Sequence, residues 1–492
     1  MTLPVSYIIT LFPLLGAFFV LIVDKNKPEN AKAVALWTTS STFIFALLQL
    51  FIPNLSKIIT HDVVSHFVSK LPGGYSVSFD NFSMLFVTFV CLVCFLSVMW
   101  IRQHEITYQK SFFISLLLFE VFTIGAFYSA DMFLLFFCME STMIPIYTMM
   151  LSHDKECSDE SVSTRSFLEG NNSYILQYFL YSMTSALLVL TAIIMIYLET
   201  NTSNLFEIYN IGIKNEQIFW IMLLGIAIKM PMWPFCNWLP TVHTKANVIC
   251  SVLLASVVLK FSTLLVVRFI NPLYNNLFIK LTSPVNSYYI GRYSVFLFMT
   301  CFISMLIAVA NIFRQSDLKR FFSYFSIVHM NLYFLIVINN GGENNFIYAM
   351  LQHSLISVIM FFTADIIEGL FETRDMNEIR ESGLQFRGLR MFLLCIFLAL
   401  IGIPSTSGFI SEIMVIYSVS KVSYIYAIAT LLITVVLSTY IFFVYNSTFG
   451  KRKMLKQNNA VRALTINGDR KAVITLCYIL ILLLGVFPML VL

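Results

Sequence analysis

Charged residues are scarce in this sequence. They make up 12% of its 492 residues, about half of the share found in ordinary soluble domains. Hydrophobic residues make up 58%, and the mean hydropathy is +0.82. This number of polar groups is too small to cover the surface of a soluble globular protein of this size. The composition therefore predicts a polytopic membrane protein.

Motifs for nucleotides and nucleic acids are also lacking. The sequence contains neither a glycine-rich dinucleotide fingerprint nor a P-loop. The formal net charge is only +5, and the basic residues are spread over loops instead of forming one stripe. We therefore expect no nucleic-acid partner.

Cysteine pairs suited to a redox centre are nearly absent. Nine cysteines are scattered along the chain, and only Cys91 and Cys94 form a CxxC, inside the apolar stretch Asn81–Ile101. An iron–sulfur or redox motif needs loop geometry and several thiolates. We predict that these two are small residues facing lipid or other helices. The chain is expected to hold no metal or cofactor, so if it serves a redox enzyme it holds none of the redox centres itself.

Glycine is infrequent, with 18 residues, whereas Phe (48) and Tyr (23) are abundant. Together with the many Ile and Asn residues, this bias is typical of an AT-rich organellar genome. An apolar segment begins a few residues after Met1, so we expect no cleavable presequence. These features are typical of a mitochondrially encoded protein, for which we expect the mitochondrial inner membrane once the chain is known to span a membrane; the alternative is the plasma membrane of an AT-rich bacterium.

Long apolar runs dominate what is present. A bilayer core about 30 Å thick needs about 20 apolar residues per helix, and fourteen segments meet this condition. The polar breaks between them are too short for a separate folded domain. Seven segments lack charge: Val5–Val23, Ala33–Ile52, Asn81–Ile101, Ser173–Leu198, Tyr293–Phe313, Val422–Tyr445 and Ala472–Leu492.

The other seven segments each carry an ionisable residue at or near the centre. A charge there costs about 2.5–3.5 kcal/mol on insertion scales, so such a residue is by default a candidate for function. The segments are Ser111–Ala130 with Glu120, Met132–Leu151 with Glu140, Ile218–Pro240 with Lys229, Ala246–Val267 with Lys260, Phe321–Asn339 with His329, Phe346–Ala364 with His353, and Met391–Val419 with Glu412.

Two of these segments are interrupted by proline. Pro231 and Pro234 follow Lys229, and Pro404 precedes Glu412. Pro404 lies 173 residues after Pro231. Broken helices in corresponding positions indicate internal repeats around an ion site in the membrane. We predict four parts: three helices in residues 1–110, five-helix repeats in 111–270 and 291–446, and a last helix in 471–492.

Lys229 and Glu140 are the sharpest candidates for proton transfer. Burial away from water favours a neutral amine, and a nearby carboxylate favours the charged one. Moving one group relative to the other would therefore load and unload a proton. The alternative is a static ion pair that only fixes how the helices pack.

The remaining buried groups are interpreted as a relay. Lys260 is expected to receive the proton and Glu412 to be the last carrier, with His329 and His353 between them because histidine titrates near neutral pH. Glu120 and His243 are secondary candidates; His243 is expected to gate the first break or to hydrogen-bond its exposed backbone. The cluster Asp317, Lys319 and Arg320 is interpreted as a capped, solvated helix end.

Five ordered motifs resemble the antiporter-like proton-translocating subunits of respiratory complex I. The number of segments and the end of the chain just after the last one are most similar to the branch without a C-terminal lateral helix. The motifs are DMFLLFFCMESTMIPIY (Asp131–Tyr147), IKMPMWPFCNWLPTVHTKANVICSVLLASVVLK (Ile228–Lys260), SDLKRFFSYFSIVHMNL (Ser316–Leu332), MLQHSLIS (Met350–Ser357) and GIPSTSGFISE (Gly402–Glu412).

The resemblance implies an all-α membrane protein of about fourteen helices, with two inverted five-helix repeats and broken seventh and twelfth helices. It implies proton translocation driven by remote electron transfer, with NADH, FMN, iron–sulfur clusters and ubiquinone on partner subunits. Neighbouring membrane-arm subunits and lipids such as cardiolipin are the expected partners. The family's intramembrane charges correspond here to Glu140, Lys229, Lys260 and Glu412, and its histidines to His329 and His353.

The sequence departs from the family pattern next to the first break. The family usually has histidine at the position of Cys236, an acidic residue at Lys245 and proline at Asn247. Three alternatives stay open at this point: an Mrp-type cation/proton antiporter subunit, a structural scaffold in which the charges only hold helices together, and a solute transporter. The last is the weakest, because the sequence shows no site for anything larger than an ion.

Overall fold

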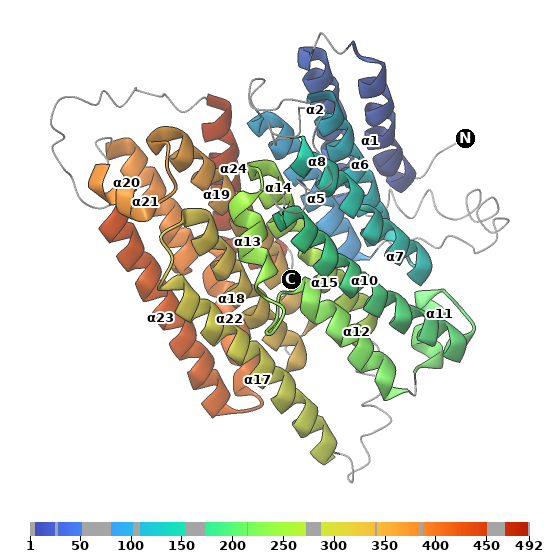
Figure 1. Cartoon of the computed structure of the whole chain (residues 1–492). Helices are drawn as coiled ribbons and strands as arrows, with labels where there is room; N and C mark the ends of the chain where they lie inside the picture. Colours follow the sequence, from blue (N-terminus) through green and yellow to red (C-terminus); the bar gives the residue numbers. More distant parts are fainter. Residues whose placement is uncertain are drawn as a thin grey trace. The chain divides into compact units, whose positions relative to one another are not determined.

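The computed structural model describes residues 5–24, 28–51, 80–101, 109–152, 173–213, 215–271, 287–339, 342–382, 387–449 and 468–490. Within these ranges the regular structure is helical, apart from two isolated β-bridges (Figure 1). Ten helices among these residues are long and apolar enough to cross a membrane. The predicted all-α membrane fold is confirmed, whereas the number fourteen stays a prediction.

The chain forms two compact units. The first comprises Met1–Ile226 and Leu264–Lys280. In it α1 packs against α2 and α6, and α2 packs against α5. Its helices are α1 (Val5–Ile22), α2 (Pro28–Phe51), α5 (Asn81–Trp100), α6 (Gln109–Tyr128), α7 (Met132–Ser141), α8 (Met143–Leu151), α10 (Ser173–Thr200), α11 (Leu205–Ile211) and most of α12 (Glu216–Lys229), with the π-helical η3 (Val266–Ile270).

The second unit comprises Ala227–Thr263 and Leu281–Leu492. Its central helix is α18 (Leu318–Ile338), which is buried on almost every side and packs against α13, α17, α19 and α22. The other elements are α13 (Trp238–Lys245), α14 (Val248–Leu253), the π-helical η2 (Leu254–Val258), the start of α15 (Lys260–Leu265), α17 (Ser287–Ile312), α19 (Glu343–Phe371), α20 (Met376–Ser382), α21 (Arg387–Ile401), α22 (Ser407–Ser420), α23 (Tyr424–Thr448), α24 (Gly468–Val486) and the 3₁₀ turn η4 (Pro488–Leu490).

Both predicted interruptions are present. Helix α12 ends at Lys229 and α13 begins at Trp238, with eight residues between them that include Pro231 and Pro234. Proline has no N–H to donate and its ring collides with the preceding turn, so the helix stops there. Helix α21 ends at Ile401, and the next residue, Gly402, has φ of +74°, a left-handed conformation that suits glycine. The boundaries of the predicted repeats stay a prediction.

Two further irregularities were not predicted. The segment Met132–Leu151 is divided at Thr142, three residues before Pro145, which cannot donate to the carbonyl of the preceding turn. The segment around Lys260 contains the π-helical turn η2, in which the N–H of Leu259 donates to the oxygen of Leu254 at 3.0 Å. Such turns are frequent at functional sites, and this one ends two residues before Lys260.

Candidate functional site

Lys260 occupies the interior of the second unit. Its side chain is fully buried, so it does not extend to the membrane surface as a snorkelling lysine would. The amine Nζ donates to the carbonyl of Ala255 at 3.2 Å and lies 2.7 Å from Nδ1 of His353. The sulfur of Met330 is 3.7 Å away. The π-helical turn η2 contains Ala255, so this turn directly supports the amine.

The two relay histidines lie on neighbouring helices. His353 is on α19 and His329 on α18, and their ring centroids are 6.4 Å apart. Nδ1 of His329 donates to the carbonyl of Phe325 at 3.1 Å, and its Nε2 lies 3.9 Å from Oε1 of Glu412. Because Nδ1 is engaged with the backbone, Nε2 is the nitrogen free to exchange a proton with the carboxylate.

Glu412 is placed by the second break. It lies in the second turn of α22, and its side chain is 17% exposed. A Cβ atom added at Gly402 would lie 3.3 Å from its Oε1. Glycine therefore suits position 402 for two reasons. The turn requires a positive φ, and the carboxylate of Glu412 lies where a Cβ atom would crowd it.

These contacts bring four of the predicted residues into one buried line. The line begins at Lys260, passes through His353 and His329, and ends at Glu412. An amine, two imidazoles and a carboxylate are groups that bind and release protons. Each comes from a different helix, and the two histidines lie between the lysine and the glutamate, as expected; the order of the two histidines was not predicted. The arrangement can hold a proton at four successive positions.

Glu140 and Lys229 belong to different units of the chain. Glu140 is the residue before the end of α7 and is half-buried, next to the unpredicted division at Thr142. Lys229 is buried and is the last residue of α12, directly before the first break. Glu140 belongs to the first unit and Lys229 to the second. Their pairing stays a prediction.

Glu120 is fully buried in the first unit. Its Oε1 accepts a hydrogen bond from the hydroxyl of Thr42 at 2.7 Å, and the thiol of Cys91 is a further neighbour. Both Cys91 and Cys94 are free and fully buried against helices. The prediction that these two cysteines are small residues facing lipid or other helices is confirmed, and it is other helices that they face.

His243 does not make the hydrogen bond expected of it. It is fully buried on α13, and neither ring nitrogen has a hydrogen-bond partner among the described residues. Its ring stacks on Phe361 instead, with centroids 4.5 Å apart and the planes at 23°. The prediction that His243 hydrogen-bonds the exposed backbone of the break is therefore wrong, since the ring packs against α19 instead; its gating role stays a prediction.

The departure at Asn247 has a local explanation. Where the family usually has proline, the side chain of Asn247 accepts a hydrogen bond from the N–H of Cys250 at 2.7 Å. Asparagine is among the preferred residues at this position, because its oxygen satisfies a free N–H at a helix start. The sequence therefore begins α14 by another means.

Comparison with known proteins places this site within a family. The model of the family described as "NADH:quinone oxidoreductase/Mrp antiporter, TM" matches residues 129–439, which is more than half of the chain. The match includes all six predicted relay residues and both breaks. The chain belongs to this family.

Individual relatives agree with the branch predicted from the sequence, NADH-ubiquinone oxidoreductase chain 4. The protein of that name from Chondrus crispus is 28% identical over 83% of this chain and 80% of its own length. NADH-quinone oxidoreductase subunit M of Rickettsia typhi is 28% identical over 86% of this chain and 84% of its own length. These names confirm the predicted similarity.

Solved structures show the same fold. A chain of respiratory complex I from Thermus thermophilus has a TM-score of 0.73 and 20% identity, covering 98% of this chain and 96% of that one. A chain of the Mrp complex from Dietzia sp. DQ12-45-1b has a TM-score of 0.78 and 16% identity, covering 100% and 96%. The antiporter-like membrane fold is thus shared by both kinds of complex.

Proposed function

We propose that this chain translocates protons as a membrane-arm subunit of an NADH:ubiquinone oxidoreductase. The observation that carries the proposal is the buried line from Lys260 through His353 and His329 to Glu412. A charge costs free energy in a membrane interior unless it is paired or solvated. Four titratable groups that follow one another through the interior therefore indicate a path for protons more than a means of holding helices together.

The proton moves in three steps along this line. Lys260 gives a proton to Nδ1 of His353, 2.7 Å from its amine. Transfer to His329 crosses the 6.4 Å between ring centroids, which requires rotation of a ring or a bridging water. Nε2 of His329 then passes the proton to Glu412.

Glu140 and Lys229 receive the coupling energy in this proposal. A change in the field around this pair alters how tightly Lys229 holds a proton, and Lys229 then supplies Lys260. Moving one proton against 100 mV takes about 2.3 kcal/mol. A tenfold change in proton affinity corresponds to about 1.4 kcal/mol. A change of about a hundredfold is therefore sufficient.

The proposal also assigns the surroundings of the chain. NADH, FMN, iron–sulfur clusters and ubiquinone are bound by partner subunits in this proposal, as the similarity to NADH-quinone oxidoreductase subunits suggests. Its neighbours are other antiporter-like and membrane-arm subunits together with lipids, including cardiolipin. The composition, rich in Phe and Tyr and poor in glycine, supports the mitochondrial inner membrane as its location.

Purification of the tagged chain from its native membranes tests the proposal. We expect the purified sample to show flavin and iron–sulfur absorbance. We also expect the complex, in sealed vesicles, to acidify the solution on one side of the membrane when NADH is oxidised by quinone. Glu412→Gln should abolish the acidification, whereas Glu372→Gln, at an exposed carboxylate, should not.

Two results would contradict it. Sodium/proton exchange without flavin or iron–sulfur absorbance would favour the Mrp-type antiporter. Normal pumping in Glu412→Gln would favour a structural scaffold.

A further inference from the structure

Two short segments of the chain fold into the same turn. Thr202–Glu207 reads TSNLFE and Thr373–Glu378 reads TRDMNE. In each, the threonine hydroxyl donates to the glutamate five residues later and accepts from the N–H two residues later. A seven-residue helix follows, α11 in the first case and α20 in the second.

Each turn pairs with the start of an apolar membrane helix. Asp131, the N-cap of α7, bridges to Asn204, and Asp317, the N-cap of α18, bridges to Asp375. We call these pairings the first and the second clasp. Their backbone bonds match: Met132 N to Ser203 O (3.0 Å) and Leu205 N to Ala130 O (3.0 Å) in the first, Leu318 N to Arg374 O (3.1 Å) and Met376 N to Ser316 O (2.8 Å) in the second.

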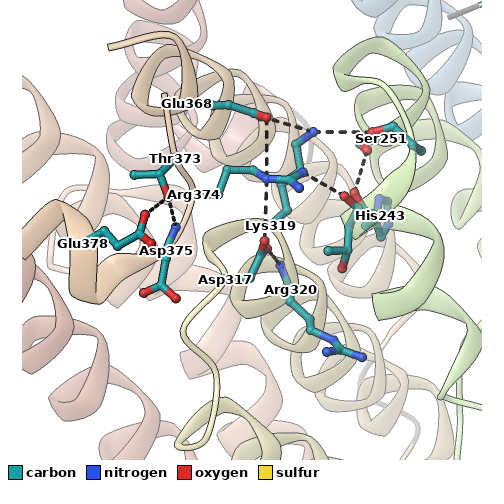
Figure 2. Close-up of polar contacts among 12 residues, drawn as sticks. His243, Ser251, Asp317, Lys319, Arg320, Glu368, Thr373, Arg374, Asp375 and Glu378 are labelled. Carbon is teal, nitrogen blue, oxygen red and sulfur yellow. Dashed lines mark hydrogen bonds and ion pairs between the residues drawn. The ribbon is translucent and has the colours of Figure 1, made fainter. Parts of the chain in front are cut away.

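The clasps differ in charge. Where the first has Phe133 and Ser203, the second has Lys319 and Arg374. Both cations of the second clasp reach the C-terminal end of α13 (Figure 2). Arg374 Nη1 donates to the carbonyl of Thr244 at 2.8 Å. Lys319 Nζ donates to the carbonyl of Ala246 at 3.4 Å.

The second clasp also balances its own charges. Glu368, at the end of α19, lies 3.7 Å from Nζ of Lys319 and 3.6 Å from Nε of Arg374. Asp317 lies 3.6 Å from the same Nε. The predicted cap by Asp317 is confirmed, since its side chain accepts from the N–H of Arg320. The prediction of a solvated end is wrong for Lys319, whose side chain is only 4% exposed, because the end of α13 covers it.

Helix α13 needs such support. It has eight residues, too few for a helix that is stable by itself. The last carbonyls of a helix lack partners within it, and cations are favourable at this negative end of the helix dipole. Ser251 supplies a third external donor, to the carbonyl of His243 at 3.3 Å. The end of α13 is therefore held by side chains of other elements.

We propose that Lys319 and Arg374 are positioning residues that hold α13 against the start of α18 and the end of α19. Helix α13 directly follows the first break, and α18 and α19 carry His329 and His353. The second clasp thus fixes the half-helix after the break relative to the buried histidines, without carrying protons itself. The inference rests on the proposed function for its effect on pumping, but not for its effect on α13.

Hydrogen–deuterium exchange in the intact complex tests the contact directly. In Lys319→Met and in Arg374→Met, we expect amides of residues 238–246 to exchange about tenfold faster, as the loss of a charge-assisted hydrogen bond implies. Arg320→Met removes an exposed cation from the same turn and should leave this exchange unchanged. Lys319→Arg and Arg374→Lys keep the charge and should restore slow exchange at least in part.

Pumping supplies the second readout. Protons moved per NADH should fall in both methionine variants while the flavin content of the complex stays constant, and the conservative variants should recover. If the methionine variants fail to assemble, Glu368→Gln keeps both cations and should raise exchange in α13 by a smaller factor.

Unchanged exchange in α13 of both methionine variants would contradict the proposal that Lys319 and Arg374 hold this helix. Faster exchange with a normal number of protons per NADH would contradict the role of this contact in pumping. A wild-type complex that moves no protons would contradict the proposed function alone, since exchange would still measure the clasp.

Discussion

The amine of Lys260 lies 2.7 Å from Nδ1 of His353, although the two residues are 93 positions apart in the sequence. Both side chains are fully buried, so this contact joins two titratable groups away from solvent. The π-helical turn η2 supports the amine through the carbonyl of Ala255. In the proposed mechanism, this contact makes the two residues successive positions of one path.

If Lys260 and His353 act on one path, their substitutions are not additive. We expect Lys260→Met and His353→Ala each to slow quinone-linked proton pumping by about a hundredfold, the order of magnitude of a lost proton-transfer group. The double variant should pump no worse than either single one, because a path interrupted once carries nothing further. Proton uptake by vesicles, normalised to NADH oxidised, measures this.

Met330→Leu is the matched control for this pair, because its sulfur touches the same amine at 3.7 Å but carries no proton. It should pump normally. Additive losses in the double variant would show that the two residues serve different paths.

Glu140 and Lys229 should be essential to pumping but not to assembly. We expect Glu140→Gln and Lys229→Ala each to abolish quinone-linked pumping, because each removes one charge of the pair that we propose to control proton affinity. Co-purification of the partner subunits measures assembly, and acidification of vesicles measures pumping.

Replacing both residues together with apolar ones separates this mechanism from a scaffold. A buried ion pair that only holds helices together can be exchanged for apolar packing with little loss, so a scaffold would remain active. Normal pumping in both single variants would reject the ion-pair mechanism.

Gly485→Ala should destabilise the second break. A Cβ atom there would lie 2.2 Å from the carbonyl oxygen of Ser405 and 2.5 Å from the carbonyl carbon of Thr406. Both atoms belong to the backbone and cannot move far, so we expect the free energy of unfolding to fall by about 1–3 kcal/mol, as at other overpacked sites. Thermal unfolding of the purified complex measures it.

Gly369→Ala is the control for this substitution. A Cβ atom added at Gly369, near the end of α19, meets no heavy atom within 4 Å, so this variant should be as stable as the wild type or gain up to about 1 kcal/mol. Equal unfolding temperatures for the two alanine variants would show that the loop after Gly402 accommodates the extra atom.

The sequence allowed prediction of the features that depend on neighbours along the chain. Apolar length predicted the membrane helices, and Pro231 and Pro404 predicted where two of them stop, because proline acts on the turn directly before it. The third division, at Thr142, had a comparable signal in Pro145. The relay candidates were found because an ionisable residue in an apolar segment is conspicuous whatever its partners are.

Residue order and composition were thus enough to predict a helical membrane protein with broken helices and buried titratable groups. They did not reveal that Lys260 contacts His353, that His243 stacks on Phe361, or that Lys319 is buried under the end of α13. Periodicity and composition record the local preference of each segment, whereas a contact between distant residues depends on how whole helices pack, which no single segment encodes.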